Sequence, residues 1–579
     1  MATLFTKSDK YTSEYACSII RIGECFPIDG KDRIVRTMVN GESIVVRKDL
    51  VKEGDILFYA SNETQLNADF LSANNLFESS SYELNSNADE VKPIQERLQK
   101  NKKSVEAIMT YSSKIAYCVN YLKGHRQLTE EDMASYQQCV DTITKHCYKI
   151  DNVDVDSVID CGCRYIDELE DKVIMLRNEI NNDTELLRTK VGFFNKNCRV
   201  KMIRFGGVPS MGYLFSLNEM YNFNPKVKDV NLEELVGEDF DTVDGIEFIK
   251  AYVPFVPQKQ QRTRKDKTNK IIERFDRMIK GEFAFHYDTE PFAKNIERFK
   301  PTDTVSISLK LHGTSGIFGK VKVKKPIKLP FFQRVWNKFI DITKLFKGKR
   351  ITDYIIEYGN VTSSRKVIRN QYINKDVNGG FDEADIWSEW GELLYPYLEE
   401  GMIVYGEIFG YVTGSDKMIK KGYDYGCEVG ENKLMIYRIT TKNENNETVE
   451  WEVSDVYDWT TKLIEEHEEL KDRITPINIL YHGTLGDLYK ELDTETHWHD
   501  NLLEYMRHDT KRFGMEKREP LCKSHKVFRE GIVIRIDNDP ISEAYKLKCN
   551  NFLLAESKLM SDIAEGKEEI SQEMLETYT

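Results

Sequence analysis

Near the start of the chain, apolar and polar positions alternate over short segments, as they do in half-buried β-strands. This pattern predicts strands at Ala16–Arg21, Ile34–Val39, Glu42–Val46 and Ile56–Ala60. Asn40 and Gly41 stand between the second and third of these strands. This dipeptide is typical of a two-residue hairpin turn. The segment therefore predicts a small antiparallel barrel.

From about residue 86 the apolar spacing becomes helical. Val155, Val158 and Ile159 recur at the period of a helix face, and Ile166, Leu169 and Val173 continue the pattern. Strand character returns at Val200–Arg204. We expect a helical insertion over 86–195, with the barrel formed by residues 1–85 and 196–255.

Composition favours a soluble globular protein. Of 579 residues, 40% are apolar and 31% are charged. No apolar run approaches the roughly 18–20 residues that span a bilayer. The first residues contain no apolar signal-peptide core, and the eleven cysteines are scattered. We therefore expect a reducing, cytoplasmic location.

The net charge is −14, but basic side chains are concentrated locally. Residues 259–280 hold nine basic and three acidic side chains, a net of +6, and we expect a basic linker over 256–295. Residues 320–350 hold eleven basic side chains and one acidic residue, Asp341, a net of +10. An acidic total does not exclude nucleic-acid binding, because contacts depend on the local potential.

The most informative candidate for chemistry is Lys310. It ends the apolar strand segment Val305–Leu309 and is followed by His312 and Gly313. Such a lysine is either a nucleophile or simply a surface residue at the end of a strand.

Five later segments favour the nucleophile over the surface lysine. Each places polar or charged residues in or beside an apolar strand: Val361–Arg365 with Arg365, Ile403–Gly410 with Glu407, Leu434–Ile439 with Tyr437, Glu530–Arg535 with Glu530, and Ala544–Lys548 with Lys546 and Lys548. The last two lysines are two residues apart, so in a strand they share a face.

Together and in this order, these segments resemble the nucleotidyltransferase motifs of the covalent ligase and capping-enzyme superfamily. The Lys310-Leu311-His312-Gly313-Thr314-Ser315 and Tyr405-Gly406-Glu407 forms look most like those of ATP-dependent RNA ligases. Residues 15–60 and the segment from Arg199 to Phe215 resemble the N-terminal OB domain of one branch, which has no C-terminal domain.

The resemblance implies an α+β fold, with an OB-like barrel, the helical insertion and an adenylyltransferase domain of ATP-grasp-like antiparallel sheets over 296–579. It implies an RNA ligase that joins 5′-phosphate and 3′-hydroxyl ends through a lysyl-AMP on Lys310. ATP and Mg²⁺ or Mn²⁺ would be the cofactors. The implied partner is RNA, or a nicked duplex with an RNA 3′-hydroxyl end, and no membrane.

The resemblance also implies roles for particular residues. Lys546, Lys548 and Arg365 would act on phosphates, and Glu407 and Glu530 would contact ribose and metal. Tyr437 would stack on adenine, as aromatic faces do. Leu309, His312 and Gly313 would complete the nucleotide pocket. Family members often carry an acidic residue where this chain has Leu309, which affects the expected adenine contacts.

Two rival functions are weighed. A DNA ligase or guanylyltransferase would carry another OB domain after the last motif, and only 31 residues follow Lys548. A non-catalytic nucleic-acid-binding protein would not need the complete set of Lys310, Glu407, Glu530, Lys546 and Lys548.

Two segments allow several interpretations. In 320–350, Phe331, Phe332, Trp336, Phe339 and Phe346 interleave with lysines. The stretch could bind nucleic acid, dock its aromatic residues on the domain, or lie on a membrane surface. Cys139, His146, Cys147, Cys161 and Cys163 could bind zinc, but they lack paired Cys-x-x-Cys spacing, so buried helical cysteines are expected.

Overall fold

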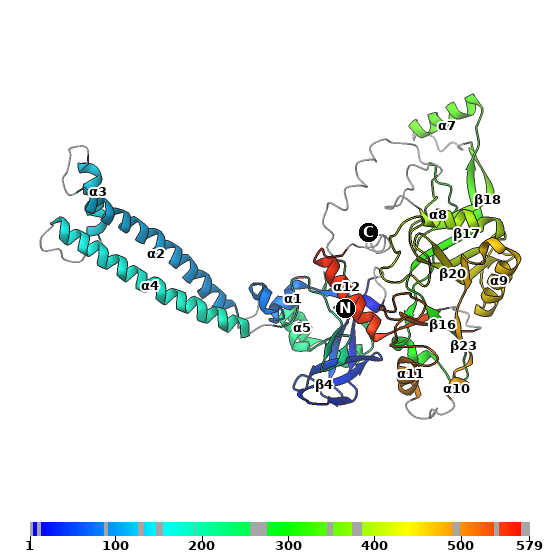
Figure 1. Cartoon of the computed structure of the whole chain (residues 1–579), viewed down its shortest axis with the longest axis horizontal. Helices are drawn as coiled ribbons and strands as arrows, with labels where there is room; N and C mark the ends of the chain where they lie inside the picture. The colour runs from blue at the N-terminus through cyan, green and yellow to red at the C-terminus, as the bar shows by residue number, and fades with distance from the viewer. Residues whose placement is uncertain are drawn as a thin grey trace. The chain divides into compact units, whose positions relative to one another are not determined.

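The computed structural model describes residues 4–8, 13–85, 91–125, 132–145, 154–189, 192–254, 275–343, 351–372, 385–489, 498–537 and 543–568. The chain forms two compact units. The first comprises Met1–Glu24, Val46–Lys201 and Gly212–Tyr252, and the second comprises Cys25–Val45, Met202–Met211 and Val253–Thr579. Residues 256–274 of the expected basic linker lie outside the described residues, and the rest of it, from residue 275, is described. Figure 1 labels most of the helices and several of the strands.

In the first unit the strands are short and form separate sheets. The largest has the order β10-β6-β2-β11, and the others are β1-β12-β13 and β14-β7. The bounds are β1 Phe5–Thr6, β2 Cys17–Arg21, β6 Ile56–Ser61, β7 Thr64–Leu66, β10 Gly212–Phe215, β11 Asp239–Phe240, β12 Thr242–Val243, β13 Ile246–Glu247 and β14 Ile249–Ala251. Among the described residues no sheet closes on itself, so the expected barrel is not confirmed.

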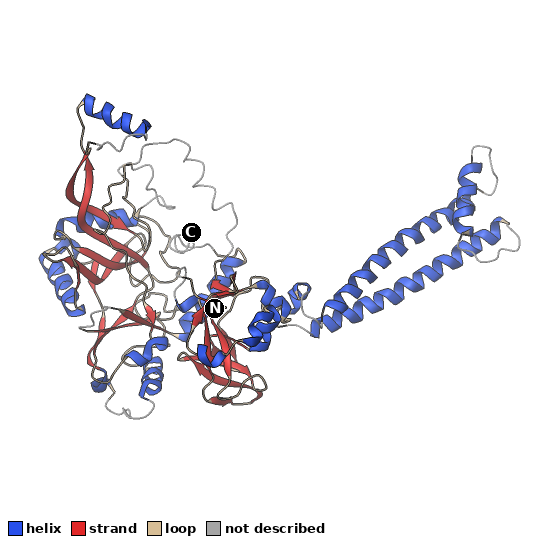
Figure 2. Cartoon of the chain, turned by 180° about the vertical axis from the view of Figure 1, so that it is seen from behind, coloured by secondary structure: helices blue, strands red, loops and turns tan. Residues whose placement is uncertain are grey.

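Three long helices make up the helical segment of this unit. They are α2 (Lys92–Gly124), α3 (Met133–Thr144) and α4 (Val155–Thr189), drawn in blue in Figure 2. Helices α2 and α4 are joined by the Arg97–Asp183 ion pair and by a 2.9 Å hydrogen bond from Asn101 to Glu179. Their apolar positions, including Val119, Ile143 and Val158, form a core of their own. Shorter elements nearby are α1 (Ala68–Ala73) and α5 (Leu217–Phe223).

The predicted hairpin around Asn40 and Gly41 is confirmed, but it belongs to the second unit. Strands β3 (Cys25–Ile28), β4 (Lys31–Val39) and β5 (Glu42–Arg47) form one sheet. Asn40 and Gly41 have φ values of 49° and 72°, as a type I′ turn requires. A second hairpin, β8 (Ile203–Phe205) and β9 (Val208–Ser210), replaces the strand expected at Val200–Arg204.

The rest of the second unit contains two larger sheets. One has the order β15-β25-β24-β16-β23, and the other has the order β18-β17-β19-β20-β21 with β22 beside β20. The strands of the first are β15 Glu290–Pro291, β16 Thr304–Lys310, β23 Ile479–Thr484, β24 Gly531–Ile536 and β25 Ala544–Lys548. Those of the second are β17 Thr314–Pro326, β18 Tyr354–Ser363, β19 Ile403–Gly410, β20 Asn432–Lys442, β21 Thr448–Glu450 and β22 Ile474–Pro476.

The described helices of this unit are α7 (Phe331–Thr343), α8 (Ile386–Leu394), α9 (Val453–Glu466), α10 (Leu485–Leu488), α11 (Trp498–His508) and α12 (Asn550–Ala564). Most strand pairs are antiparallel; β15–β25 and β20–β22 are parallel. The α+β class is confirmed. Within the described part of the chain, no helix combines the length and apolar character that crossing a membrane requires.

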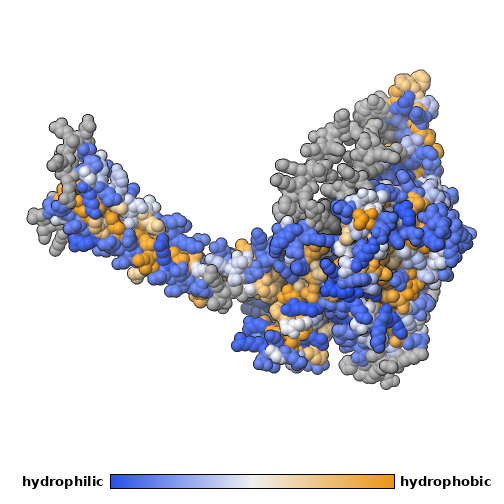
Figure 3. Space-filling model, viewed as in Figure 1, coloured by the Kyte–Doolittle hydropathy of each residue, from blue (hydrophilic) through white to orange (hydrophobic). Residues whose placement is uncertain are grey.

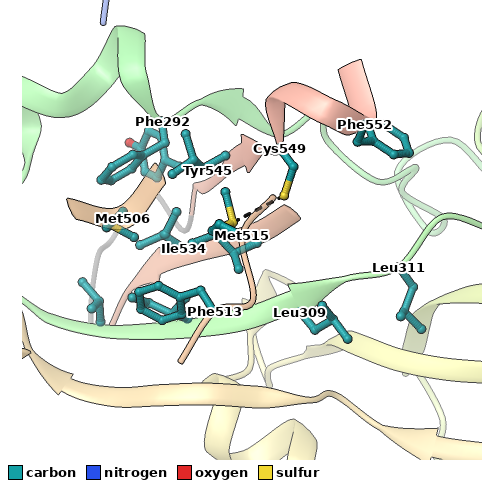
Figure 4. Close-up of a cluster of buried hydrophobic side chains, with 14 of the residues drawn as sticks. Phe292, Leu309, Leu311, Met506, Phe513, Met515, Ile534, Tyr545, Cys549 and Phe552 are labelled. Atoms are coloured by element: carbon teal, nitrogen blue, oxygen red, sulfur yellow. Dashed lines mark hydrogen bonds between the residues drawn. The ribbon is translucent and has the colours of Figure 1, made fainter. Parts of the chain in front are cut away.

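One apolar core fixes the orientation of the site strands. Leu309, Leu311, Ile534 and Tyr545 are buried together, and Cys549 donates a 3.6 Å hydrogen bond to Met515 within the same cluster (Figure 4). Side chains alternate between the two faces of a strand. Lys310 on β16, and Lys546 and Lys548 on β25, therefore lie on the face opposite this core.

Candidate active site

Two lysines from different strands converge on one carboxylate. Lys310 and Lys548 lie in register on either side of Gly531, the partner of both in the β16–β24–β25 ladder. The Lys310 Nζ lies 3.0 Å from Glu530 Oε1, and the Lys548 Nζ lies 3.8 Å from the same oxygen. The sheet register thus brings together three residues that lie up to 238 positions apart in the sequence.

Gly531 is necessary for this arrangement. Its φ is +151°, and a Cβ there would lie 2.1 Å from the carbonyl oxygen of Leu547. Any larger residue would push β24 and β25 apart. The glycine therefore sets the close spacing at which Glu530 meets both lysines.

The C-terminal helix adds a second carboxylate, which the sequence motifs do not include. Glu556 on α12 lies 3.1 Å from the Lys548 Nζ. The first turn of α12 is held by Glu516, whose side-chain oxygens accept hydrogen bonds from the backbone N–H groups of Asn550 and Asn551. No local sequence pattern distinguishes Glu556 from an exposed helical glutamate, so only the fold reveals it.

His312 lies between this cluster and an aromatic wall. Its Nδ1 is 3.3 Å from Glu530 Oε2, and its backbone N–H donates a 2.8 Å hydrogen bond to the Tyr425 hydroxyl. The ring meets Phe552 and Tyr423 edge to face at centroid distances of 5.0 and 4.8 Å. Both the backbone and the ring of His312 are therefore fixed.

The two carboxylates of this cluster, Glu530 and Glu556, both have lowered pKa values. Burial alone would raise the pKa of Glu530, but the charge of Lys310, with His312 and Lys548 nearby, outweighs it and holds the pKa well below its usual range. Glu556 shows the same opposition: burial raises its pKa, the charge of Lys548 lowers it, and the net shift is downward. Both carboxylates are therefore ionised at neutral pH and balance the two lysines.

Glu407 lies on the other large sheet and contacts the turn after Lys310. Its Oε1 accepts a 2.8 Å hydrogen bond from the Gly313 N–H. A Cβ on Gly313 would lie 2.3 Å from the Ile408 carbonyl oxygen, so only glycine fits between the turn and β19. The structure thus brings Gly313 and Glu407 together, as expected for one nucleotide pocket.

Tyr437 occupies a β-bulge. Tyr405 pairs with Arg438 and Gly406 pairs with Ile436, so Tyr437 is the extra residue between them. Bulges redirect side chains and occur next to active sites. Burial raises the pKa of the Tyr437 hydroxyl well above its usual range. The ring contacts His286 edge to face at 5.3 Å.

Arg365 and Lys546 share an acidic neighbour. Arg365 pairs with Asp288. Burial would raise the pKa of Asp288, but the charge of Arg365, its hydrogen bond and the nearby Lys366 and Lys546 lower it. Two of the predicted phosphate-binding residues therefore surround one carboxylate, at a place where a phosphate would find the same charges.

A buried arginine pair beside this region was not predicted. Arg438 and Arg535 share Glu450, at 2.7 Å and 2.6 Å. The Arg438 guanidinium also lies over the rings of Tyr287 and Tyr405, with distances of 4.4 and 4.1 Å to the ring centroids. Neither arginine has a sequence signal that marks it as buried.

Leu309 behaves as a core residue. Its side chain is 2% exposed, and its N–H donates a 2.9 Å hydrogen bond to the Asn478 carbonyl. The contribution of Leu309 to a nucleotide pocket remains a prediction. Its side chain belongs to the apolar core, so only its backbone could take part.

The described side chains offer few ligands for a metal ion. No group of three or more histidine, cysteine, aspartate or glutamate side chains with metal-ligand geometry occurs among them. A magnesium ion that keeps its waters needs only one or two protein carboxylates plus substrate phosphates. Glu530 and Glu407 fit that smaller requirement. Of the zinc candidates, His146 and Cys147 lie outside the described residues, and Cys139 is a buried core residue.

Comparisons with known proteins give the following. No family model matches the chain, and no curated protein matches it. Among solved structures, a lysine-to-alanine variant of Naegleria gruberi RNA ligase with ATP and Mn is 13% identical, with a TM-score of 0.42, covering 93% of this chain and 98% of that one.

Two further structures of the same Naegleria gruberi enzyme are similar to the chain. A lysine-to-methionine variant with AMP and Mn is 12% identical, and the enzyme with PPi is 13% identical. Each has a TM-score of 0.42 and covers 94% of this chain and 98% of its own.

Proposed function

We propose that the chain is an ATP-dependent RNA ligase that joins 5′-phosphate and 3′-hydroxyl ends through a lysyl-AMP on Lys310. One observation carries the proposal: Lys310 and Lys548, from separate strands, meet at one oxygen of the buried Glu530. Two ammonium groups held this close mark a place suited to a polyanion. The triphosphate of ATP has that chemistry.

The first transfer forms a bond between the Lys310 Nζ and the α-phosphorus and breaks the bond from that phosphorus to the bridging oxygen. Pyrophosphate leaves, and the amine loses its proton. Lys548 would face the charge that develops on the phosphates. A preorganised cation in that position stabilises the developing charge effectively. Glu530 and Glu556 hold the two amines in place beforehand.

In the second transfer, a 5′-phosphate oxygen attacks the AMP phosphorus, and the bond to the Lys310 Nζ breaks as the amine regains a proton. In the third, a 3′-hydroxyl attacks the activated 5′-phosphorus and AMP leaves. Arg365 suits the 5′-phosphate, since a guanidinium binds phosphate oxygens in a fork geometry. Asp288 would release Arg365 when that phosphate arrives.

The remaining site residues would hold the nucleoside and a metal ion. We assign Tyr437 to adenine stacking and Glu407 to the ribose, beside the Gly313 turn. Glu530 and Glu407 would hold Mg²⁺ or Mn²⁺, which supplies positive charge for the phosphates. The OB-like character of the N-terminal strands and a role in RNA repair or nick sealing belong to the same proposal, which also places the protein in the cytoplasm.

The choice of RNA rests on the Lys310–Ser315 and Tyr405–Glu407 sequence forms. We expect sealing to require ribose on the 3′-hydroxyl side of a nick, because the 2′-hydroxyl is the local mark that separates RNA from DNA. The test uses nicked duplexes whose last 3′-side nucleotides are ribose or deoxyribose, with ATP and Mg²⁺. Preferential sealing of the ribose nick supports the proposal. Equal sealing of both would favour a DNA ligase, and no sealing of either would favour a non-catalytic binding protein.

A further inference from the structure

Helix α7 turns its apolar side chains outward. Phe331, Phe332, Val335 and Trp336 form one stripe along the helix, with exposed fractions of 65%, 85%, 51% and 50%. On another side of the helix, the buried Asn337 makes hydrogen bonds of 2.8 and 2.9 Å with the backbone of Ile351. An amphipathic helix of a globular domain ordinarily buries its apolar stripe. The interpretation in which these aromatic residues dock on the domain is therefore wrong for the three whose side chains are described, Phe331, Phe332 and Trp336.

Strand β17, which leads into α7, is basic. Lys322 and Lys324 lie two residues apart on β17, so they share a face, and their Nζ atoms lie 6.0 and 5.6 Å from the ring centroids of Tyr358 and Tyr354. Lys328 and Arg334 are exposed nearer the helix. Figure 3 shows apolar surface at the end of this hairpin, over α7, with hydrophilic surface beside it. Rings and cations thus follow one another along the hairpin.

We propose that this surface, here called the aromatic arm (Lys322, Lys324, Lys328, Phe331, Phe332 and Trp336), binds single-stranded RNA that flanks the ends to be joined. The proposal rests on the proposed ligase function for the identity of the polyanion. Exposed rings stack on unpaired bases whatever their sequence, and lysines between them neutralise the backbone. A duplex would not offer its bases to these rings.

The distribution of charge distinguishes RNA from a lipid surface. A helix that lies on a membrane carries many cations around its own polar face. In the part of α7 whose side chains are described, residues 331–337, Arg334 is the one basic residue. The other described cations are spread along β17 and the following turn, at Lys320, Lys322, Lys324, Lys325 and Lys328, and Lys325 pairs with Glu357 at 2.9 Å. A strand of RNA can follow that line, and a bilayer surface does not need it.

The arm is remote from the nucleotide. β17 starts at Thr314, beside the motif turn, and its 13 residues extend about 40 Å at the usual rise of a strand. Ser315, which pairs with Glu407, lies on the opposite strand face from Lys322 and Lys324. The arm therefore holds flanking RNA and takes no part in the transfer of AMP to Lys310. It should raise affinity for RNA and leave ATP labelling unchanged.

The test measures binding of a fluorescent, unstructured oligoribonucleotide of about 20 residues to the full chain, by anisotropy over a range of salt concentrations. The variants are Phe331→Ala with Phe332→Ala, Trp336→Ala, and Lys322→Gln with Lys324→Gln. Val429→Ala serves as the matched control, because Val429 is 65% exposed elsewhere in the same unit. Circular dichroism verifies the fold of each variant.

We expect affinity to fall about tenfold for each ring that stacks on a base. The lysine pair should reduce the slope of log affinity against log salt by about 1.4. Val429→Ala should bind as the parent does, and every variant should still be labelled by ATP. Unchanged RNA affinity in the ring variants would overturn the arm. A membrane surface would be supported in its place if the parent co-sedimented with phosphatidylcholine–phosphatidylserine vesicles, the ring variants did not, and RNA affinity stayed unchanged.

The outcomes for the arm and for the ligase are distinguishable. Failure of the parent protein to label with ATP would count against the proposed ligase alone. Loss of RNA affinity in the ring variants would still support the arm in that case.

Discussion

At the scale of single residues, the site is a balance of charges. Lys310 and Lys548 bring two positive charges, and Glu530 and Glu556 bring two negative ones. Each lysine therefore has a carboxylate partner before any nucleotide arrives. The arrangement keeps the lysines in position without leaving an unpaired buried charge, which would cost several kcal/mol.

Lys548→Ala tests the second lysine. We expect labelling by ATP to fall about a hundredfold or more, because one preorganised cation facing the phosphates is lost. Lys558→Ala is the matched control, since Lys558 is exposed on the neighbouring helix α12. Labelling is followed on a gel with α-labelled ATP. Parent-like labelling of the Lys548 variant would show that its pairing with Glu530 and Glu556 is only structural.

Glu530→Gln tests the depressed pKa. A carboxylate whose folded pKa lies below its unfolded value contributes stability above the unfolded pKa, and this contribution is lost as the pH falls toward the folded pKa. We therefore expect the variant to be less stable by on the order of 2 kcal/mol at pH 7. The difference from the parent should shrink as the pH falls below about 4.5.

Thermal unfolding of both proteins between pH 7 and pH 3 provides the measurement. Glu466→Gln is the control, because Glu466 is exposed and pairs with Lys462 on the surface at 3.7 Å. A stability difference that stays constant with pH would contradict the assignment of the lowered pKa to Glu530.

At the scale of elements, Gly531 controls how β24 lies against its neighbours. We expect Gly531→Ala to reduce ATP labelling at least tenfold and to lower the unfolding temperature, because the new Cβ would meet the Leu547 carbonyl at 2.1 Å. Gly124→Ala is the control, since its Cβ would meet nothing within 4 Å. Normal labelling and stability of the Gly531 variant would mean that the spacing of Lys310 and Lys548 does not depend on this contact.

Some of these elements could be predicted from the sequence and others could not. Apolar segments with charged residues in or beside them predicted the strands that carry Lys310, Glu407 and Lys548 and the strand that follows Glu530, because such a pattern is a local property. The Asn40–Gly41 turn was predictable for the same reason. Separate sheets in place of a closed barrel were not, because closure depends on strand pairing over long distances.

Three features, two of them in the site region, depend on tertiary packing. Glu556 enters it only because α12 folds back onto β25. Arg438 and Arg535 become buried only because Glu450 lies between them. The outward stripe of α7 has the same pattern as an inward one, so its exposure could not be read from periodicity.

At the scale of the whole molecule, every residue assigned to the chemistry belongs to the second unit, and the long helices α2–α4 belong to the first. Backbone hydrogen bonds join the chain on either side of the helical segment. The Glu78 N–H donates to the Phe194 carbonyl at 2.8 Å, and the Gly192 N–H donates to the Phe77 carbonyl at 3.0 Å. This arrangement allows the helical segment to be removed without opening the rest of its unit.

We expect that replacing residues 86–190 with a short Gly-Ser linker leaves ATP labelling within about twofold of the parent. Short flexible loops close at little entropic cost when their ends are already close. The measurement is the rate of labelling of purified protein, with circular dichroism to verify the loss of helix. A large loss of labelling in a folded variant would show that the helices act in the first transfer.

The most direct measurement of the central claim is the mass of the tryptic peptide that contains Lys310 after incubation with ATP and Mg²⁺. A lysyl-AMP predicts one added AMP on Lys310, absent in Lys310→Ala, while that variant still seals a pre-adenylated RNA end. Lys322→Ala, on the same unit, should carry the adduct as the parent does. An adduct on another residue, or none at all, would contradict the account.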